Sequence, residues 1–189
     1  RIYERIINLK MCTFYSKEEK DQLTSSFWKL NTDVLDLPHS TKITSKDLYY
    51  FEKATSVANT SKHFQFRIGS IITSNNRIIS KKCNQMKTNP VQNYYNDLVL
   101  KKNPLSVKRV SSCIHAEMSA IQAAKKHPSF DPHNSTIYIS RVLRRDSTLA
   151  SSFPCRSCFL AIKDIGIDRI VCYDDLGRII SIEDFIDNI

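Results

Sequence analysis

Two short motifs carry side chains suited to metal-dependent chemistry. His115-Ala116-Glu117 supplies an imidazole and a carboxylate, and Pro154-Cys155-Arg156-Ser157-Cys158 supplies two thiols. One imidazole and two thiolates fill three positions of a tetrahedral zinc site and leave the fourth for water, which is the pattern of catalytic zinc. A carboxylate two residues after the histidine can move that water's protons without binding the metal. We therefore expect one catalytic Zn2+ ion held by His115, Cys155 and Cys158, with Glu117 as the proton carrier.

Each motif stands where a helix is expected to begin. Apolar residues at helical spacing follow His115, and a second such stretch follows Cys155 and stops at Gly166. Cys155 and Cys158 are three residues apart, so both sulfurs lie on one face of the second helix. The positive end of a helix dipole favours a thiolate over a thiol. The N-termini of the two helices must therefore converge on the metal.

The order H-x-E and then P-C-x-x-C resembles the signature of the zinc-dependent cytidine and deoxycytidylate deaminase superfamily. The other expected elements agree with that resemblance: a helix from Thr44 to Asn59, a hairpin of strands over 66–73 and 77–80, and strands over 136–140 and 169–173. The resemblance covers roughly residues 45–180. It implies the α/β class, as a three-layer α/β/α fold around a mixed five-stranded sheet.

The resemblance also implies roles for individual residues. Asn84, which follows the second strand, matches an asparagine that contacts the substrate's ribose or the neighbouring backbone, although a turn asparagine is the simpler interpretation. Ala116 would offer its backbone N–H beside the base. Lys87-Thr88-Asn89-Pro90 is similar to a K-T-x-P string of phage-borne members. Ser119 is a departure, because deoxycytidylate deaminases commonly read H-A-E-x-N and have asparagine at that position.

The last strand has two possible structures. Asp174-Asp175-Leu176-Gly177 can turn the chain into an antiparallel strand over 178–181, or Ser181 can begin a helix that leaves the strand truncated. An antiparallel strand would resemble the branch of the family that acts on free cytidine. In the deoxycytidylate and nucleic-acid branches a helix normally intervenes and the fifth strand is parallel.

Length and composition indicate one globular domain with an appendage. The chain has 189 residues, of which 41% are hydrophobic and 25% charged, as in soluble proteins. We expect an N-terminal helical extension over 1–44, with a capping-box helix from Ser16 to about Leu30, and a catalytic domain over 45–189. No apolar run approaches the roughly 18 residues of a membrane span, and no signal peptide is visible. Six cysteines interpreted as reduced thiols or metal ligands favour the cytoplasm.

The net charge of +9 is concentrated just before His115, where residues 63–113 carry nine basic side chains and Asp97 alone as acid. Such an excess favours a phosphate-bearing partner, although a solvated basic face is the plainer interpretation. The segment 84–112 reads as a long, irregular functional loop, and 141–153 as a polar basic loop. The basic side chains that we expect to contact substrate from these loops are Lys87, Arg141, Arg144 and Arg145.

Three functions compete on this evidence. The first is a deaminase that converts a small cytosine nucleotide, dCMP-like, into the uracil nucleotide and ammonia. The second acts on cytosine in single-stranded DNA or RNA, or on adenosine in tRNA, with Tyr94, Tyr95 and Phe153 as stacking groups. The third is an inactive binding module, which has no need of Glu117. The family resemblance further implies a homo-oligomer, and nothing points to a membrane.

Overall fold

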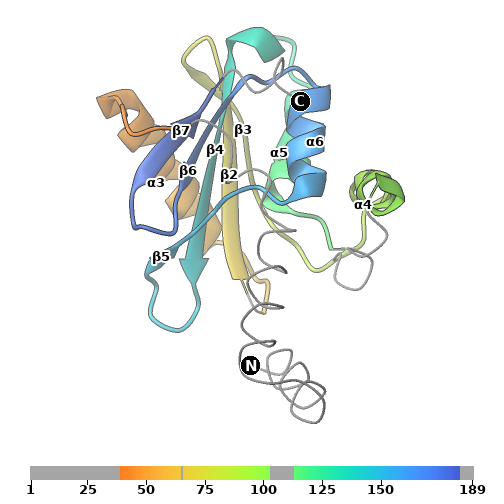
Figure 1. The fold of residues 1–189 in the computed structure, drawn as a ribbon, viewed down its shortest axis with the longest axis horizontal. Coiled ribbons are helices and arrows are strands. Elements are labelled where there is room, and N and C mark those ends of the chain that lie inside the picture. The colour runs from red at the N-terminus through yellow and green to blue at the C-terminus, as the bar shows by residue number, and fades with distance from the viewer. Residues whose placement is uncertain (1–38, 65, 103–112, 184–189) are drawn as a thin grey trace. The chain divides into compact units, whose positions relative to one another are not determined.

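The structure is a computed structural model that describes residues 39–64, 66–102 and 113–183 (Figure 1). Residues Val34–Ile189 belong to one compact unit of the chain. The helix expected from Ser16 lies outside the described residues, and the division into 1–44 and 45–189 stays a prediction. The elements run in the order β1 (His39–Ser40), α3 (Ser45–Asn59), β2 (Phe66–Ser74), β3 (Arg77–Cys83), α4 (Pro90–Lys102), α5 (Ala116–Ala124), η2 (Pro132–Asn134), β4 (Ser135–Leu143), β5 (Leu149–Ala150), α6 (Arg156–Asp164), β6 (Arg169–Tyr173) and β7 (Ile179–Ile182).

The described strands form one mixed sheet in the order β1-β7-β6-β4-β2-β3, with β5 paired to β4. Strands β4 and β6 are parallel, whereas the other neighbours are antiparallel. Helix α3 covers one face of the sheet, and α5 and α6 cover the other (Figure 1). The predicted three-layer α/β/α fold is therefore confirmed. Its five expected strands are β2, β3, β4, β6 and β7, and the two-residue strands β1 and β5 are additions.

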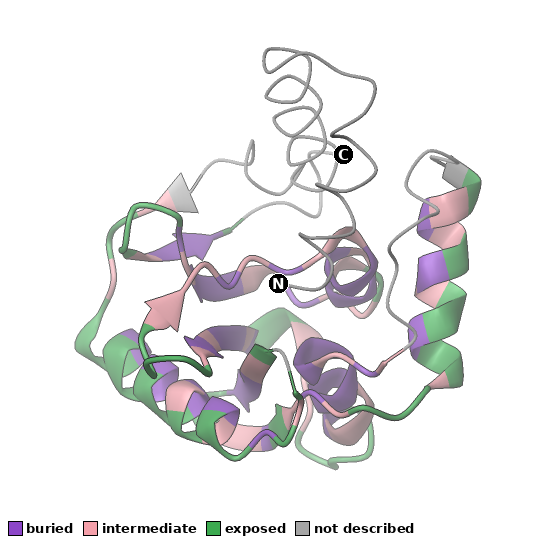
Figure 2. Ribbon diagram, turned by 90° about the horizontal axis from the view of Figure 1, so that it is seen from below, coloured by how far each residue is buried: buried purple, intermediate pink, exposed green. Residues whose placement is uncertain are grey.

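Alternating side chains of the strands build a core on each face of the sheet. Ile72, Ile137 and Ile139 pack with the apolar residues of α5 and α6, whereas Ile71 and Tyr138 pack with those of α3. Successive strand residues point to opposite faces, and β-branched isoleucines suit both layers. Figure 2 shows the buried residues on the strands and on the inner faces of these helices. Helices α5 and α6, which begin at the two sequence motifs, are thus held side by side on one face of the sheet.

The segment after β3 corrects the expectation of a long irregular loop over 84–112. Residues 90–102 form α4, which begins at a proline and is preceded by Asn89, whose Oδ1 accepts hydrogen bonds from the N–H groups of Val91 and Gln92. Proline is favoured in the first helical turn. The buried side of α4 includes the polar residues Gln92 and Asn96. Hydrophobic periodicity therefore missed this helix.

The structure decides between the two possible C-terminal arrangements. Strand β7 pairs antiparallel with β6, and the turn between them has Gly177 at φ 80°. Asp174 Oδ1 accepts hydrogen bonds from the N–H groups of Leu176 and Arg178, which closes the turn. The alternative helix beginning at Ser181 is wrong, since Ser181 lies in β7.

Candidate metal centre

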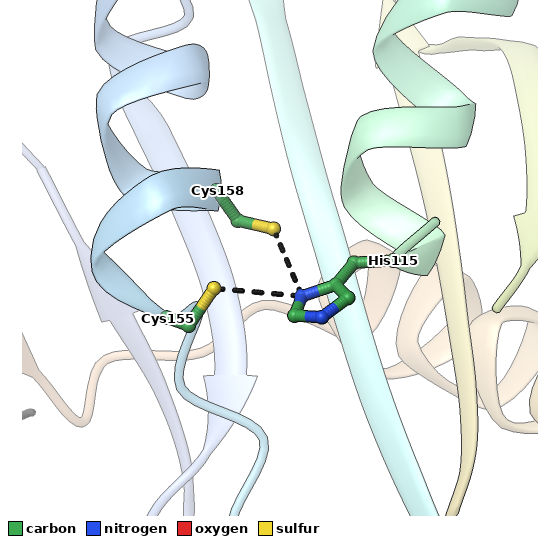
Figure 3. Close-up of side chains that lie close together, drawn as sticks. All are labelled: His115, Cys155 and Cys158. Carbon is green, nitrogen blue, oxygen red and sulfur yellow. Dashed lines mark hydrogen bonds between the residues drawn. The ribbon is translucent and has the colours of Figure 1, made fainter. Parts of the chain in front are cut away.

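His115, Cys155 and Cys158 lie together between the N-termini of α5 and α6 (Figure 3). His115 Nδ1 is 3.4 Å from the Sγ atom of Cys155 and 3.4 Å from that of Cys158. Ligands at typical zinc distances and tetrahedral angles place nitrogen and sulfur about 3.5 Å apart. Within the described ranges, these three residues are the one His/Cys/Asp/Glu group compact enough to hold a metal ion. Their spacing fits the zinc ion expected from the sequence.

The local chain directions explain how the ligands meet. His115 is the N-cap residue of α5 and Cys155 is that of α6, and both have extended backbone angles. An N-cap side chain commonly binds the first free N–H groups of its helix. Neither His115 nor Cys155 does so, which leaves both side chains directed toward each other. Cys158, one helical turn further on, is completely buried.

The protonation states of the three ligands depend on one another. The hydrogen bond from Cys158 and the nearby imidazole of His115 hold the pKa of Cys155 well below its usual value against the effect of burial. The same pairing and burial raise the pKa of Cys158. Burial lowers the pKa of His115, but the Cys155 thiolate outweighs this effect and raises it to about 9. The metal-free site thus favours a thiolate beside an imidazolium, and zinc binding must release protons.

Glu117 lies in the first turn of α5 and is 3% exposed. Its Oε2 atom is buried, and no described residue forms a hydrogen bond with it. Burial raises the pKa of Glu117, while the nearby His115 charge acts in the opposite direction. Buried carboxylates are normally hydrogen-bonded, so this oxygen is free to take a partner from outside the described residues, such as a water molecule. Together with the ligand geometry, this open oxygen fits a catalytic zinc site with a water molecule.

Asn84 is buried at the end of β3 and is held by the chain. Its Oδ1 accepts hydrogen bonds from Ser61 Oγ and from the N–H of Ile68, and its Nδ2 donates to the carbonyl of Phe66. These bonds fasten the start of β2 to the end of β3. Ala116 is the first residue of α5, where a backbone N–H has no partner within the helix.

The expected basic residues have different surroundings. Arg141 belongs to β4 and not to a loop, and strand alternation places it on the same face as Ile137 and Ile139, beneath α5 and α6. Its guanidinium carbon lies 4.3 Å from the centre of the Phe66 ring. Arg141 Nε is buried and donates no hydrogen bond to any described residue, and burial lowers the pKa of the guanidinium. The structure thus brings the half-buried Arg141 to the face that carries the metal centre.

The other three basic residues are exposed. Arg144 donates from Nε to the carbonyl of His63, and Arg145 pairs with Asp146 at 2.9 Å. Lys87 lies in the turn that precedes α4. Since Lys87, Arg144 and Arg145 all reach solvent, their side chains are available to a partner but are not directed by burial.

His63 is a residue that the sequence did not single out. Its ring is half-buried and stacks on Phe64 and on Phe66, with centroid distances of 5.1 and 6.4 Å. Burial lowers the pKa of His63, and the positive charge of His115 lowers it further. The segment that leads into β2 contacts the expected basic residues, because Arg144 bonds to the His63 carbonyl and Arg141 lies over the Phe66 ring.

Comparison with known proteins agrees with this geometry. Residues 44–174 match the family described as "Cytidine and deoxycytidylate deaminase zinc-binding region". The chain belongs to this family. Among solved structures, the chain is similar to the cytidine deaminase from Burkholderia pseudomallei, with 14% sequence identity, a TM-score of 0.50 and coverage of 75% of this chain and 93% of that chain. This likeness concerns the fold.

A second solved structure, RibD from Acinetobacter baumannii, matches with 14% identity and a TM-score of 0.35, covering 66% of this chain and 27% of that chain. A search of curated proteins finds no match. Within the part of this deaminase that the structure describes, no helix has the length and apolar character needed to cross a membrane.

Proposed function

We propose that this deaminase hydrolyses the amino group of a small cytosine nucleotide, dCMP-like, to give the uracil nucleotide and ammonia. The observation that carries this proposal is the buried Glu117 carboxylate, with an open oxygen, beside His115, Cys155 and Cys158. A structural zinc site needs no such carboxylate, whereas a hydrolytic site needs a group that moves protons.

Three residues of the chain would bind the metal ion, and a fourth would transfer protons. His115, Cys155 and Cys158 would hold the zinc ion, which supplies, when bound, a water molecule whose pKa is lowered toward about 7. Glu117 takes a proton from water and delivers it to N3 of cytosine while the water oxygen bonds to C4. Glu117 then carries the second proton to the exocyclic nitrogen as the C4–N bond breaks. One water molecule is consumed, and one ammonia molecule leaves.

Arg141 supports a substrate that carries a phosphate. This guanidinium is partly buried on an aromatic ring, and at Nε it lacks, among the described residues, the hydrogen bonds that normally offset the desolvation of a charge. A phosphate oxygen would supply them, since arginine binds phosphate through charge-assisted and often bidentate bonds. The basic excess of residues 63–113 acts in the same direction.

A second candidate substrate is the free nucleoside. Strand β7 is antiparallel to β6, which resembles the branch that acts on free cytidine, and Ser119 replaces the asparagine common in deoxycytidylate deaminases. Both observations concern the framework around the site. The choice between nucleoside and nucleotide therefore depends on what Arg141 binds.

Two further alternatives have less support. Of the three aromatic residues suggested for stacking nucleic-acid bases, Tyr95 and Phe153 pack against the core, and Tyr94 alone is exposed. An inactive binding module leaves the buried Glu117 without a role. Location in the cytoplasm and homo-oligomer formation stay predictions.

The test is an ammonia-release assay of the zinc-loaded enzyme with dCMP, deoxycytidine, dCTP, adenosine and a single-stranded oligonucleotide. We expect turnover of cytosine substrates with dCMP preferred, and no turnover by Glu117→Ala, which keeps its zinc. Activity retained by Glu117→Ala, or activity on adenosine alone, would contradict the proposal. A preference for the oligonucleotide, with binding that weakens steeply in salt, would favour the nucleic-acid alternative.

A pair of variants tests the phosphate contact. Hydrogen bonds to charged groups contribute about 1.5–3 kcal/mol, so Arg141→Gln is expected to lower the ratio of kcat/KM for dCMP to that for deoxycytidine by roughly 10- to 100-fold. Arg77→Gln is the control, because Arg77 is exposed at the far end of β3. An unchanged ratio in Arg141→Gln would leave the free nucleoside as the better candidate.

A further inference from the structure

Helix α4 is fastened to both helices that carry the metal ligands. Gln92 Oε1 accepts a hydrogen bond of 3.1 Å from the backbone N–H of His115, at the start of α5. Tyr95 Oη donates to Asp164 Oδ2 at the end of α6, with a distance of 2.6 Å. The contact with α5 is made at the backbone of a metal ligand, whereas the contact with α6 lies at the end of that helix opposite Cys155 and Cys158.

Gln92 is the most deeply placed polar residue of α4. Its side chain has no exposed surface. Its Oε1 accepts the hydrogen bond from the backbone N–H of His115, and its Nε2 donates to Asn96 Oδ1 at 3.1 Å. Burying an amide is unfavourable unless its donors and acceptors are paired. The polar inner side of α4, which hid this helix from hydrophobic periodicity, therefore has a specific partner in the backbone of a metal ligand.

The hydrogen bond from His115 to Gln92 lies at the backbone from which the His115 side chain projects. His115 is an N-cap residue, so its own N–H is not used by the hydrogen bonds of α5. The residue before it is held by two further bonds, from Ile114 N to the Lys87 carbonyl and from Gln85 N to the Ile114 carbonyl. The bond from the His115 N–H to Gln92 Oε1 is the third hydrogen bond that holds the backbone at this point. On the other side of the Cα atom, the His115 carbonyl accepts a hydrogen bond from the N–H of Ser119, so the backbone that carries the imidazole is held on both sides.

Hydrogen bonds of Asn89 and Gln122 hold the N-terminus of α4 against α5. Gln122 Nε2 on α5 donates to Asn89 Oδ1 at 2.9 Å, and the same Oδ1 accepts from the first N–H groups of α4. One asparagine thus joins the N-terminus of α4 to the middle of α5. Gln92 then lies one turn further along α4, within reach of the start of α5. This connection makes α4 a support for His115 in particular.

We propose that Gln92 is a positioning residue that holds His115 in its metal-binding orientation and thereby sets the affinity of the site for zinc. Partners that orient a metal ligand commonly change metal affinity 10- to 100-fold when they are removed. The proposal rests on the His/Cys/Cys metal centre of the proposed function and is independent of which cytosine substrate is turned over.

The test compares variants that separate the hydrogen bond from packing. Gln92→Met keeps the length of the side chain and removes the acceptor, whereas Gln92→Glu keeps an acceptor oxygen. Tyr95→Phe is the control, because it removes the hydroxyl bond of α4 to α6 and leaves His115 untouched. For each protein, the zinc Kd is measured by chelator competition, the ligand geometry by the spectrum of the cobalt-substituted protein, and the metal-free stability by thermal unfolding.

We expect Gln92→Met to raise the zinc Kd 10- to 100-fold and to change the cobalt spectrum, while Gln92→Glu stays close to wild type and Tyr95→Phe keeps the wild-type Kd. If Gln92→Met does not fold, Gln92→Asn replaces it, since its shorter side chain stays polar and falls short of the His115 N–H. The same loss of affinity is then expected.

Two results would overturn the proposal. One is a zinc Kd within twofold of wild type in Gln92→Met, or in Gln92→Asn where that variant is used. The other is an equal loss of affinity in Gln92→Met and Gln92→Glu that follows an equal fall in the Tm of the metal-free proteins, which would reduce Gln92 to a packing residue. A wild-type protein without stoichiometric zinc binding would instead refute the metal centre and with it the proposed function.

Discussion

Replacing Glu117 by glutamine separates proton transfer from every other property of the site. The carboxylate is 3% exposed, its Oε2 atom has no hydrogen bond from a described residue, and burial raises its pKa. Glutamine has nearly the same shape and can occupy the same space. It cannot take up and release a proton at neutral pH. The variant therefore leaves the three metal ligands unchanged and removes one chemical step.

The expected effect can be sized from the role of a single acid–base group. A positioned general acid–base residue contributes roughly 10²- to 10⁴-fold to a rate, which corresponds to about 3–5 kcal/mol of activation free energy. We expect kcat of Glu117→Gln to fall by that factor. Because the ligands His115, Cys155 and Cys158 are intact, the zinc content stays at one ion per chain. The Tm does not fall, since a carboxylate whose charged form is disfavoured by burial has been replaced by a neutral group.

The assay measures ammonia release at saturating substrate together with zinc content and thermal unfolding of the same preparations. A fall in kcat of less than tenfold would refute the role of Glu117 as proton carrier. Loss of zinc from Glu117→Gln would refute the separation of carboxylate and ligand set, and would show that Glu117 supports the metal itself.

Three further predictions concern the metal and the fold. Cys158→Ser is expected to lose zinc and activity, because a serine hydroxyl is a poor zinc ligand, while the equally buried Cys172→Ser keeps its zinc; metal analysis of both variants checks this. Gly69→Ala should destabilise the fold by about 1–3 kcal/mol in urea unfolding, since a Cβ atom there would collide with the backbone of α3, and an unchanged midpoint would show that α3 can move away. Asp47→Ala should cost about 3 kcal/mol, because Asp47 is 2% exposed and forms two hydrogen bonds with Arg169. Burial alone would raise the pKa of Asp47, but hydrogen bonds from Arg169 and Thr44 lower it well below 3.8. The stabilisation by the Asp47 carboxylate is thus complete above pH 3.8 and is lost as the pH falls below that value. The difference in the free energy of unfolding between wild type and Asp47→Ala, measured in urea, should therefore become smaller in acid. If this difference in the free energy of unfolding stays constant with pH, the charge of the Asp47 carboxylate is not the source of the stabilisation.

Most of the elements around the metal could be predicted because their signals are local. The strands over 66–74, 135–143 and 169–173 are rich in β-branched residues, and Asn75-Asn76 has the positive φ angles of a tight hairpin turn. The ligand set could be predicted for a similar reason. Two sulfurs three residues apart on a helix must share a face, and a helix that begins at His115 places Glu117 in its first turn.

Helix α4 could not be predicted because Gln92 and Asn96 on its buried side are polar, and the partner of Gln92 lies 23 residues later in the chain. The direction of β7 depends on pairing with β6, since the turn residues alone permit two continuations. Arg141 was expected in a loop, yet it extends β4 because β2 and β5 pair with it there. In each case the deciding contact joins residues distant in sequence.

The sequence by itself determined the layered α/β fold and the His/Cys/Cys set that can hold zinc, and it predicts Glu117 as the proton carrier, since spacing and side-chain chemistry act over a few residues. The tertiary structure alone decided what surrounds them: the hydrogen bond from the His115 N–H to Gln92, and the position of Arg141 over the Phe66 ring. These features arise from packing between separate elements, and no local pattern encodes which buried polar group will find which partner.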